Sequence, residues 1–152
     1  MNLLKSNSNN FYYSKGKGQP MVFLHGFPDC PENYENQMNY FSELGYEVFC
    51  PFMPGYHPED KELSSYDPTT ISLEIIKFIN SLDVGPVTLV GHDWGSSAAY
   101  GVASMEPSMV SRLITLSVPH GSKLVEAILT DGDQQRRSWY MFYFQLDLAD
   151  MA

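Results

Sequence analysis

Residues 91–95 read Gly-His-Asp-Trp-Gly and restrict the folds open to this chain more than any other segment. They follow the apolar run 86–90, which is typical of a buried strand, and precede residues 96–105, whose small side chains predict a helix lying close to a sheet. A glycine at each end permits a turn in which two backbones nearly touch and the central residue takes strained dihedral angles. The segment therefore predicts a sharp strand-to-helix turn that lifts the Asp93 side chain above the sheet.

Short β-rich runs alternate with amphipathic segments of helical length from Phe11 onward. This alternation predicts an α/β fold, in which a mostly parallel sheet carries helices on both faces. We expect strands at residues 11–13, 21–24, 46–50, 86–90 and 109–118, and helices at residues 32–44, 69–82, 96–105 and 123–129. Thr69 or Thr70 is expected to cap the second helix. The polar residues 131–133 are expected to form a link to the aromatic segment that follows them.

The start of the chain, residues 1–10, has one lysine and a polar Ser/Asn run. It has no apolar stretch long enough for a signal peptide or a membrane span. We interpret it as a flexible leader and expect a cytoplasmic protein with no membrane partner. The two cysteines, Cys30 and Cys50, are too few for a disulfide framework and are expected to be reduced thiols.

The formal net charge of −9 at pH 7 limits the partners of the chain. An acidic surface repels phosphate backbones, and no cluster of lysine and arginine offsets that repulsion locally. We therefore expect no nucleic acid partner. The length of 152 residues and the hydrophobic fraction of 43% are ordinary for one globular domain with its own core.

Asp93 stands at the centre of the predicted turn, where we expect the chemistry of the protein. A carboxylate can attack an electrophilic sp³ carbon and form an ester intermediate, which is a recognised mode of covalent catalysis. The helix that follows favours the ionised carboxylate through its dipole and its free N–H groups. The plainer interpretation is that Asp93 only caps this helix, but the strand and helix on either side favour a nucleophile.

A second motif, His25-Gly26-Phe27-Pro28-Asp29, follows the expected central strand. Beside a nucleophile turn, an oxyanion hole takes one N–H from the residue after the nucleophile and one from the loop of an earlier strand. These would be the N–H groups of Trp94 and Phe27. His25, Gly26 and Pro28 complete the predicted oxyanion-hole and substrate-binding loop, which Pro28 stiffens, through a cis bond if one is present. A plain strand-to-helix turn is the alternative.

Together the two motifs resemble the epoxide hydrolase and haloalkane dehalogenase branch of the α/β-hydrolase superfamily. The resemblance extends over most of residues 11–146, with Gly55-Tyr56 and Val118-Pro119-His120 as further matches. It implies that residues 11–132 are the N-terminal part of an α/β-hydrolase core and that residues 133–152 begin its helical cap. It also implies a small-molecule substrate, either an epoxide or a halogenated compound, and no metal or organic cofactor.

The resemblance also implies roles for single residues. Asp93 matches the nucleophile of the family. Tyr140 lies in the segment 137–145, which looks like the first cap helix, and matches a tyrosine that hydrogen-bonds the epoxide oxygen and assists ring opening as an acid. Tyr143 is the next candidate for this role, and simple packing of Tyr140 on Phe144 is the structural alternative.

Phe27 helps to choose between the two branches. Dehalogenases of this family usually place an asparagine at that position, which holds the halide together with the tryptophan beside the nucleophile. This chain has Trp94 but Phe27, which favours an epoxide hydrolase; haloalkane or haloacid dehalogenation is the enzymatic alternative. The chain also departs from its relatives at Phe52, where they often carry aspartate, and at Glu35, where they often carry arginine.

The family needs a histidine, oriented by an acid, to activate the water that hydrolyses the ester, and both residues come from strands after the cap. None of the four histidines, at positions 25, 57, 92 and 120, stands in that place. We therefore expect the chain to be inactive alone, and a non-catalytic truncated isoform or fragment is the alternative to an enzyme. The strand expected at residues 109–118 would form an exposed sheet edge, through which the chain could self-associate.

Overall fold

The structure is a computed structural model that describes residues 2–151. The chain divides after Val118 into two compact units, Met1–Val118 and Pro119–Ala152. This division falls earlier in the chain than the core–cap boundary that we expected at residue 132. Each unit is described separately below.

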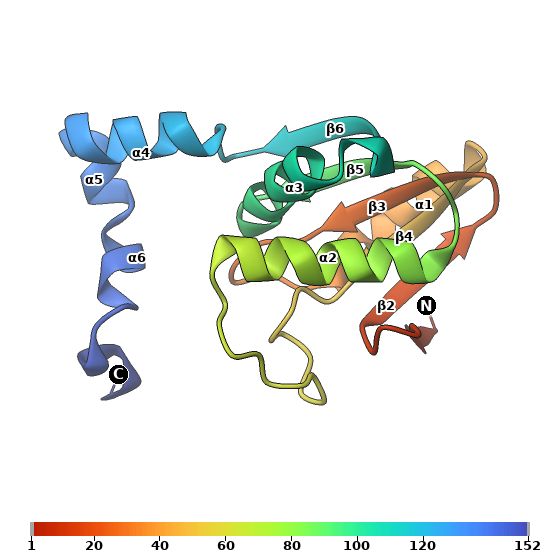
Figure 1. Cartoon of the computed structure of the whole chain (residues 1–152), viewed down its shortest axis with the longest axis horizontal. Helices are drawn as coiled ribbons and strands as arrows, with labels where there is room; N and C mark the ends of the chain where they lie inside the picture. Colours follow the sequence, from red (N-terminus) through yellow and green to blue (C-terminus); the bar gives the residue numbers. More distant parts are fainter. Residues whose placement is uncertain (1, 152) are drawn as a thin grey trace. The chain divides into compact units, whose positions relative to one another are not determined.

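The first unit is built on a six-stranded sheet with the strand order β1-β2-β4-β3-β5-β6 (Figure 1). Its strands are β1 (Leu3–Lys5), β2 (Phe11–Gly16), β3 (Gln19–Leu24), β4 (Tyr46–Pro51), β5 (Val87–His92) and β6 (Val110–Leu116). The pairs β4–β3, β3–β5 and β5–β6 are parallel, whereas β1–β2 and β2–β4 are antiparallel. The predicted mostly parallel sheet is therefore confirmed, and its two antiparallel pairs lie at one edge, where β2 runs opposite to the other strands.

Helices cover both faces of this sheet, as the alternation of the sequence predicts. One face carries α2 (Pro68–Leu82) and α3 (Trp94–Met105), and the other carries η1 (Pro31–Tyr34) followed by α1 (Glu35–Glu43) (Figure 1). A short 3-10 turn, η2 (Pro107–Met109), leads from α3 into β6. Parallel strands need such crossover helices, because consecutive parallel strands cannot be joined by a tight turn.

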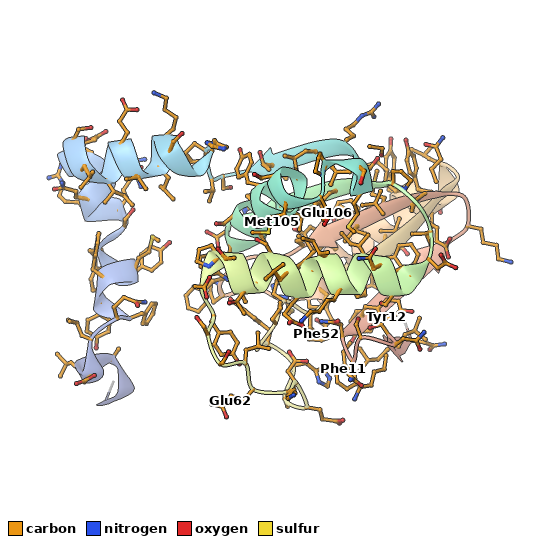
Figure 2. All side chains as sticks on the ribbon, in the orientation of Figure 1. Phe11, Tyr12, Phe52, Glu62, Met105 and Glu106 are labelled. Atoms are coloured by element: carbon orange, nitrogen blue, oxygen red, sulfur yellow. The ribbon has the colours of Figure 1, made fainter. Side chains whose placement is uncertain are left out.

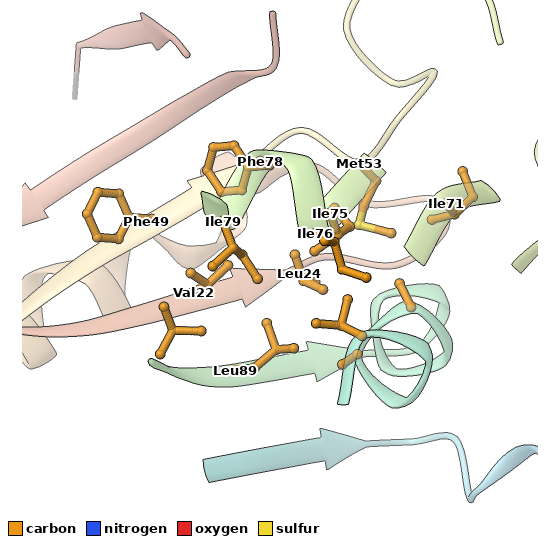
Figure 3. Close-up of a cluster of buried hydrophobic side chains, with 14 residues drawn as sticks. Val22, Leu24, Phe49, Met53, Ile71, Ile75, Ile76, Phe78, Ile79 and Leu89 are labelled. Atoms are coloured by element: carbon orange, nitrogen blue, oxygen red, sulfur yellow. The ribbon is translucent and has the colours of Figure 1, made fainter. Parts of the chain in front are cut away.

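The two faces of the sheet hold two separate clusters of buried side chains. Val22 and Leu24 of β3 belong to the cluster under α2 and α3, which Figure 3 shows in close-up. Met21 and Phe23 of the same strand belong to the cluster under α1. Successive side chains of a strand point to opposite faces, so a strand buried on both faces contributes alternate residues to two clusters. Each fully buried aliphatic side chain contributes about 1.5–3 kcal/mol to stability.

The beginning of the chain differs from the flexible leader that we expected at residues 1–10. Leu3–Lys5 forms β1 and pairs antiparallel with β2, with Leu3 opposite Tyr13. The chain reverses through hydrogen bonds between Ser6 and Asn10. The expectation failed because a three-residue strand has too little apolar pattern to be recognised; it forms because β2 offers an open edge to pair with.

The cap of α2 also differs from the prediction. Asp67, rather than Thr69 or Thr70, is the capping residue, and its carboxylate accepts hydrogen bonds from the N–H groups of Thr69 (2.9 Å) and Thr70 (3.1 Å). Pro68 then occupies the first helical position, where its missing N–H costs nothing. Hydrogen bonds from the hydroxyl of Thr70, then of Ser65, and from backbone N–H groups hold the pKa of the Asp67 carboxyl well below its usual range.

The second unit is helical. It contains α4 (Gly121–Thr130), α5 (Gly132–Arg137), α6 (Trp139–Tyr143) and η3 (Asp147–Met151). The polar link expected at residues 131–133 is instead the start of α5, because the Asp131 carboxylate caps the N–H groups of Asp133 and Gln134. Within residues 2–151, no helix is both long and apolar enough to cross a membrane.

The segment 137–145, which resembles one cap helix, is divided in the structure. α5 ends at Arg137 and α6 begins at Trp139, so the break falls at Ser138. The Ser138 side chain is buried, and its hydroxyl accepts a 2.8 Å hydrogen bond from the Gln134 side-chain amide. The Ser138 N–H still donates a 2.9 Å helical hydrogen bond to the Gln134 carbonyl, so Ser138 closes α5.

Candidate active site

Asp93 lies in the sharp turn between β5 and α3, as the sequence predicts. Its backbone has φ 52° and ψ −119°, a conformation that a residue with a side chain rarely takes. Such a backbone conformation costs on the order of 1–3 kcal/mol of free energy and persists only when the surrounding structure holds it in place. One contact that holds it is the 3.1 Å hydrogen bond that the Asp93 N–H donates to the carbonyl of Leu116 at the end of β6.

Close backbone contacts explain the small residues on either side of Asp93. A Cβ atom at Gly95 would lie 2.6 Å from the Leu24 carbonyl carbon and 2.7 Å from the His25 carbonyl oxygen. A Cβ atom at Gly91 would lie 2.7 Å from the Gly95 carbonyl carbon. Real side chains essentially never tolerate such distances, so the turn needs glycine at both positions, as predicted.

Ser96 stabilises the turn through hydrogen bonds of its side chain. The sequence analysis did not single out this residue. Its side chain is fully buried, and its hydroxyl oxygen lies 2.7 Å from the Gly91 carbonyl and 2.8 Å from the Leu116 carbonyl. It also accepts a 3.2 Å hydrogen bond from the Leu116 N–H. Ser96 therefore ties the ends of β5 and β6 to the first turn of α3.

The carboxylate of Asp93 does not cap α3, since it makes no hydrogen bond to the first N–H groups of that helix. Instead, Asp93 Oδ1 accepts a 2.8 Å hydrogen bond from the backbone N–H of Phe27. Gly26 lies directly against the carboxylate: a Cβ there would be 2.7 Å from Asp93 Oδ1. The two motifs of the sequence thus meet in one place, and the plain helix-cap interpretation of Asp93 does not hold.

The rest of the predicted oxyanion loop surrounds this contact. The Phe27–Pro28 peptide bond is cis. Trp94 is the first residue of α3, and the N–H of a first helical residue has no acceptor within its own helix. The role of the Phe27 and Trp94 N–H groups as the two oxyanion-hole donors stays a prediction.

His25 is fully buried, so its side chain acts only through the atoms packed around it. Its Nε2 accepts a 2.9 Å hydrogen bond from the N–H of Met53, in the loop after β4. Its Nδ1 lies 3.0 Å from the carbonyl oxygen of Gly26. Burial lowers the pKa of His25, which keeps the ring neutral near pH 7.

Tyr56 is a further residue of this site that the sequence analysis quoted only as part of a family match. Its ring meets the His25 ring edge-on, with the ring centroids 4.8 Å apart. Burial and, secondly, the negative charge of Asp93 raise the pKa of the Tyr56 hydroxyl. The contacts of Met53 and Tyr56 depend on how the loop after β4 folds back, and no local sequence pattern signals that.

A hollow of about 370 Å³ lies elsewhere on the first unit. It is lined by residues that include Asp83, Pro86 and Glu106, at the amino end of β5. Asp93 follows the carboxyl end of the same strand, where open α/β sheets bind their ligands. The hollow is therefore not the candidate active site.

The other three histidines make different contacts. The ring of His57 stacks on Phe11, with centroids 3.7 Å apart, and meets Phe52 edge-on at 4.9 Å; both phenylalanines are labelled in Figure 2. His92 is the last residue of β5. His120 caps the start of α4 in the second unit, where its Nδ1 lies 3.0 Å from the Ser122 hydroxyl.

Tyr140 and Tyr143 belong to α6 of the second unit. The Tyr140 ring meets the Phe144 ring edge-on, with centroids 6.3 Å apart, while Tyr143 packs against Trp139. Tyr140 is 36% exposed, so this packing does not bury the residue. The role of either tyrosine as an acid stays a prediction.

Comparison with known proteins gives the family. A family model described as "alpha/beta hydrolase fold" matches residues 19–150, which is most of the chain. The chain belongs to the α/β-hydrolase fold family. Two curated relatives of this α/β-hydrolase are AB hydrolase superfamily protein YfhM of Bacillus subtilis and an epoxide hydrolase of Caballeronia sordidicola. The first is 33% identical over 131 residues, which cover 85% of this chain and 46% of that protein. The second is 34% identical over 136 residues, which cover 84% and 40%.

The fold of this α/β-hydrolase is also found in solved structures. The crystal structure of Bacillus megaterium epoxide hydrolase in complex with an inhibitor matches with a TM-score of 0.86 and 30% identity, over 98% of this chain and 53% of that chain. The expected resemblance to the epoxide hydrolase branch is confirmed. The α/β-hydrolase chain spans less than half the length of these two curated relatives and matches an N-terminal portion of them.

Proposed function

We propose that this chain carries the nucleophile and the oxyanion hole of an epoxide hydrolase. The supporting observation is the 2.8 Å hydrogen bond from the Phe27 N–H to Asp93 Oδ1, in a turn that leaves the carboxylate unused as a helix cap. Relatives named epoxide hydrolases, such as that of Caballeronia sordidicola, favour this chemistry over others that use an aspartate nucleophile.

In the first step, Asp93 attacks one carbon of the epoxide ring through Oδ2, the oxygen that the Phe27 N–H does not hold. The C–O bond on the far side of that carbon breaks as the new ester bond forms. The epoxide oxygen leaves as a developing alkoxide and takes the proton of the Tyr140 hydroxyl, which serves as a general acid. The product is a hydroxyalkyl ester on Asp93.

In the second step, water attacks the ester carbonyl carbon of Asp93. The carbonyl oxygen is then Oδ1, which already accepts a hydrogen bond from the Phe27 N–H. The negative charge of the tetrahedral intermediate therefore develops on an oxygen that a donor already contacts. The Trp94 N–H is the second donor. The bond between the carboxyl carbon and Oδ2 then breaks, and Oδ2 leaves with the alkyl group and takes up a proton. The diol is released, and the carboxylate is restored with one oxygen atom from water.

This second step needs a base to take a proton from water, and we propose that none of the four histidines of this chain supplies it. Both ring nitrogens of His25 are engaged in a buried site, and His57 is stacked between aromatic rings. His92 is the last residue of β5, and we expect its side chain to point away from the Asp93 carboxylate. His120 belongs to the second unit, where its Nδ1 lies 3.0 Å from the Ser122 hydroxyl. The 152-residue chain is therefore expected to form the ester but to hydrolyse it very slowly.

The stoichiometry of the reaction tests this proposal. The purified chain is incubated with an aryl-substituted terminal epoxide, and its intact mass is followed together with diol release. We expect a mass gain of one epoxide per chain and almost no further diol. Asp93→Asn should show no gain, whereas Asp83→Asn should react normally, since Asp83 also has a positive φ (54°) but caps the end of α2. Labelling of Asp93→Asn, or continued diol formation, would contradict the proposal.

Haloalkane or haloacid dehalogenation is the second candidate, and Trp94 beside Asp93 favours it. Two N–H donors, one from the Trp94 indole and one from an asparagine, hold the halide in the family, but Phe27 supplies no side-chain donor. Halide release from a chloroalkane, measured in the same incubation, decides between the two reactions. If neither substrate reacts, the non-catalytic fragment becomes the better account.

We also propose that the protein works in the cytosol. Cys30 and Cys50 are both free thiols, which a reducing compartment maintains. Fractionation of cells that express a tagged chain tests this proposal, and recovery in a secreted or membrane fraction would contradict it.

A further inference from the structure

The carbonyl of Gly26 and the N–H of Phe27 belong to one peptide plane. This peptide is trans, since the cis bond of the loop is Phe27–Pro28. In a trans peptide the carbonyl and the N–H point in opposite directions. Whatever holds the Gly26 carbonyl therefore decides where the Phe27 N–H points, and it points at Asp93 Oδ1 over 2.8 Å.

The ring of His25 is the side chain that holds this carbonyl. The Met53 N–H is a donor and cannot accept, so His25 Nε2, 2.9 Å away, must be the unprotonated nitrogen. The proton of the neutral ring is then on Nδ1, which donates to the Gly26 carbonyl over 3.0 Å. Met53 thus selects the tautomer that the Gly26 carbonyl needs.

The surroundings leave the ring little freedom. His25 is fully buried, and the Tyr56 ring packs against the His25 ring in an edge-on contact, with centroids 4.8 Å apart and planes inclined at 78°. The loop after β4 folds back over the ring through a 3.0 Å hydrogen bond from the Tyr56 N–H to the Met53 carbonyl. The Gly26 carbonyl also accepts a longer, 3.2 Å bond from the Asp29 N–H, so both of its lone pairs are used.

We propose that His25 is a positioning residue of the oxyanion hole. Its neutral ring, aligned by the Met53 N–H, holds the Gly26–Phe27 peptide so that the Phe27 N–H faces Asp93. Without the ring, the Gly26 carbonyl keeps the longer bond from the Asp29 N–H. Rotation of the peptide then becomes easier and would turn a carbonyl oxygen toward the Asp93 carboxylate. His25 thus acts on the nucleophile through a backbone plane and touches no substrate. This assignment rests on the proposed function in one respect, namely that the Phe27 N–H takes part in catalysis.

Nuclear magnetic resonance of the intact chain tests this assignment without any reaction. The side-chain nitrogen signals of His25 should show a protonated Nδ1 and an unprotonated Nε2. A scalar coupling across the hydrogen bond should join the Phe27 amide nitrogen to the Asp93 carboxyl carbon. The opposite tautomer of His25 in the wild-type chain would overturn the proposal even if every variant failed to fold.

Two substitutions separate the roles of the two ring nitrogens. The side-chain amide of His25→Asn stands where Nδ1 stands and can still donate to the Gly26 carbonyl, whereas the amide of His25→Gln reaches the place of Nε2 and can still accept from Met53. We expect His25→Asn to keep most of the Phe27–Asp93 coupling and His25→Gln to lose it. The exposed residue His120 provides the control, since His120→Asn should change nothing at Phe27. A folded His25→Gln variant with the wild-type coupling would overturn the proposal.

The rate of epoxide labelling separates this proposal from the function itself. If His25 positions the site, labelling of Asp93 should slow by about 10- to 10²-fold in His25→Gln, because a misplaced reacting group loses rate on that scale. An absence of labelling in the wild-type chain, with the predicted tautomer and coupling intact, would defeat the epoxide hydrolase function but not the positioning role. Labelling of the wild-type chain together with the opposite His25 tautomer would support the epoxide hydrolase function and defeat the positioning role.

Discussion

The backbone N–H of Phe27 lies 2.8 Å from Asp93 Oδ1, although the two residues are 66 positions apart in the sequence. The sheet accounts for the contact. β3 and β5 are parallel neighbours, and Leu24 is paired with Gly91 near their carboxyl ends. The chain segments that leave these two strands must therefore begin side by side. The loop after β3 and the turn after β5 form one site because the two strands end at the same edge of the sheet.

Substitution of Gly26 should disturb Asp93 directly. A Cβ atom at position 26 would lie 2.5 Å from Asp93 Cβ and 2.7 Å from Oδ1, so either the carboxylate or the loop must move. We expect Gly26→Ala to slow the labelling of Asp93 by an epoxide by about 10²-fold, since a shift of roughly 1 Å in a reacting group costs that much.

The control for this variant is Gly132→Ala, because a Cβ at Gly132 meets no atom within 4 Å. Circular dichroism of each variant checks that it is folded. Labelling of folded Gly26→Ala at a rate within about twofold of the wild type would show that the close approach of Gly26 has no part in the reaction.

Removal of the Tyr140 hydroxyl tests the proposed acid. Tyr140→Phe keeps the ring that packs against Phe144 but has no proton to give to the epoxide oxygen. Positioned general acids contribute about 10²–10⁴ in rate, so labelling should fall by at least about 10²-fold. Tyr143→Phe is the matched control in the same helix. If only Tyr143→Phe slows labelling, the acid is Tyr143 instead.

Much of the architecture could be predicted from the spacing of apolar residues in the sequence, because that spacing follows the period of each strand or helix. The central strands and the amphipathic α2 were predictable, since each buries side chains at the period of its own geometry. Local hydrogen-bond chemistry was harder to predict. Thr69, Thr70 and Asp67 can all cap a helix, and only the structure shows that Asp67 does so with Pro68 following it.

The candidate site likewise contains residues that the sequence could predict and residues that it could not. Asp93 and Phe27 could be predicted to meet, because each stands in a motif that follows a buried strand. Ser96 and Met53 could not, because their contacts depend on how the first turn of α3 and the loop after β4 fold against the sheet. A backbone N–H such as that of Met53 has no signature in a sequence at all.

The pH dependence of stability should carry the signature of His25. Burial lowers the pKa of His25 from its ordinary value of 6.5 and outweighs the Gly26 carbonyl and the charge of Asp29, which raise it. Glu32 acts in the same direction as Asp29. The unfolded chain therefore binds a proton more readily than the folded one at pH values below 6.5. The contribution of His25 is complete above pH 6.5 and is lost as the pH falls toward the lower pKa of the folded protein.

Urea denaturation between about pH 7.5 and pH 5 measures this loss, which should not exceed about 1.4 kcal/mol for each pH unit. Comparison with His25→Asn isolates it, because the amide does not titrate in this range. The difference in unfolding free energy between the wild-type chain and this variant should shrink on acidification. A constant difference would mean that His25 does not change its protonation on unfolding.

The free side of β6 predicts self-association of the 152-residue chain. Within the described residues β6 pairs only with β5, and it leaves Ile114 39% and Leu116 49% exposed. An edge strand with apolar side chains is a template for pairing with another chain. We expect concentration-dependent oligomers in analytical ultracentrifugation, and Ile114→Lys should reduce them. Leu73→Lys, on the exposed side of α2, is the control; monomeric wild-type chain at high concentration would refute the expectation.

The central claim is that the Asp93 carboxylate bonds covalently to carbon. Peptide mapping by mass spectrometry after incubation with a terminal epoxide tests it most directly. The account predicts one modified peptide, spanning the turn between β5 and α3, with fragment ions that place the mass of one epoxide on Asp93. A label found instead on Asp29 or Glu32 of the neighbouring loop, or spread over many surface carboxylates, would contradict it.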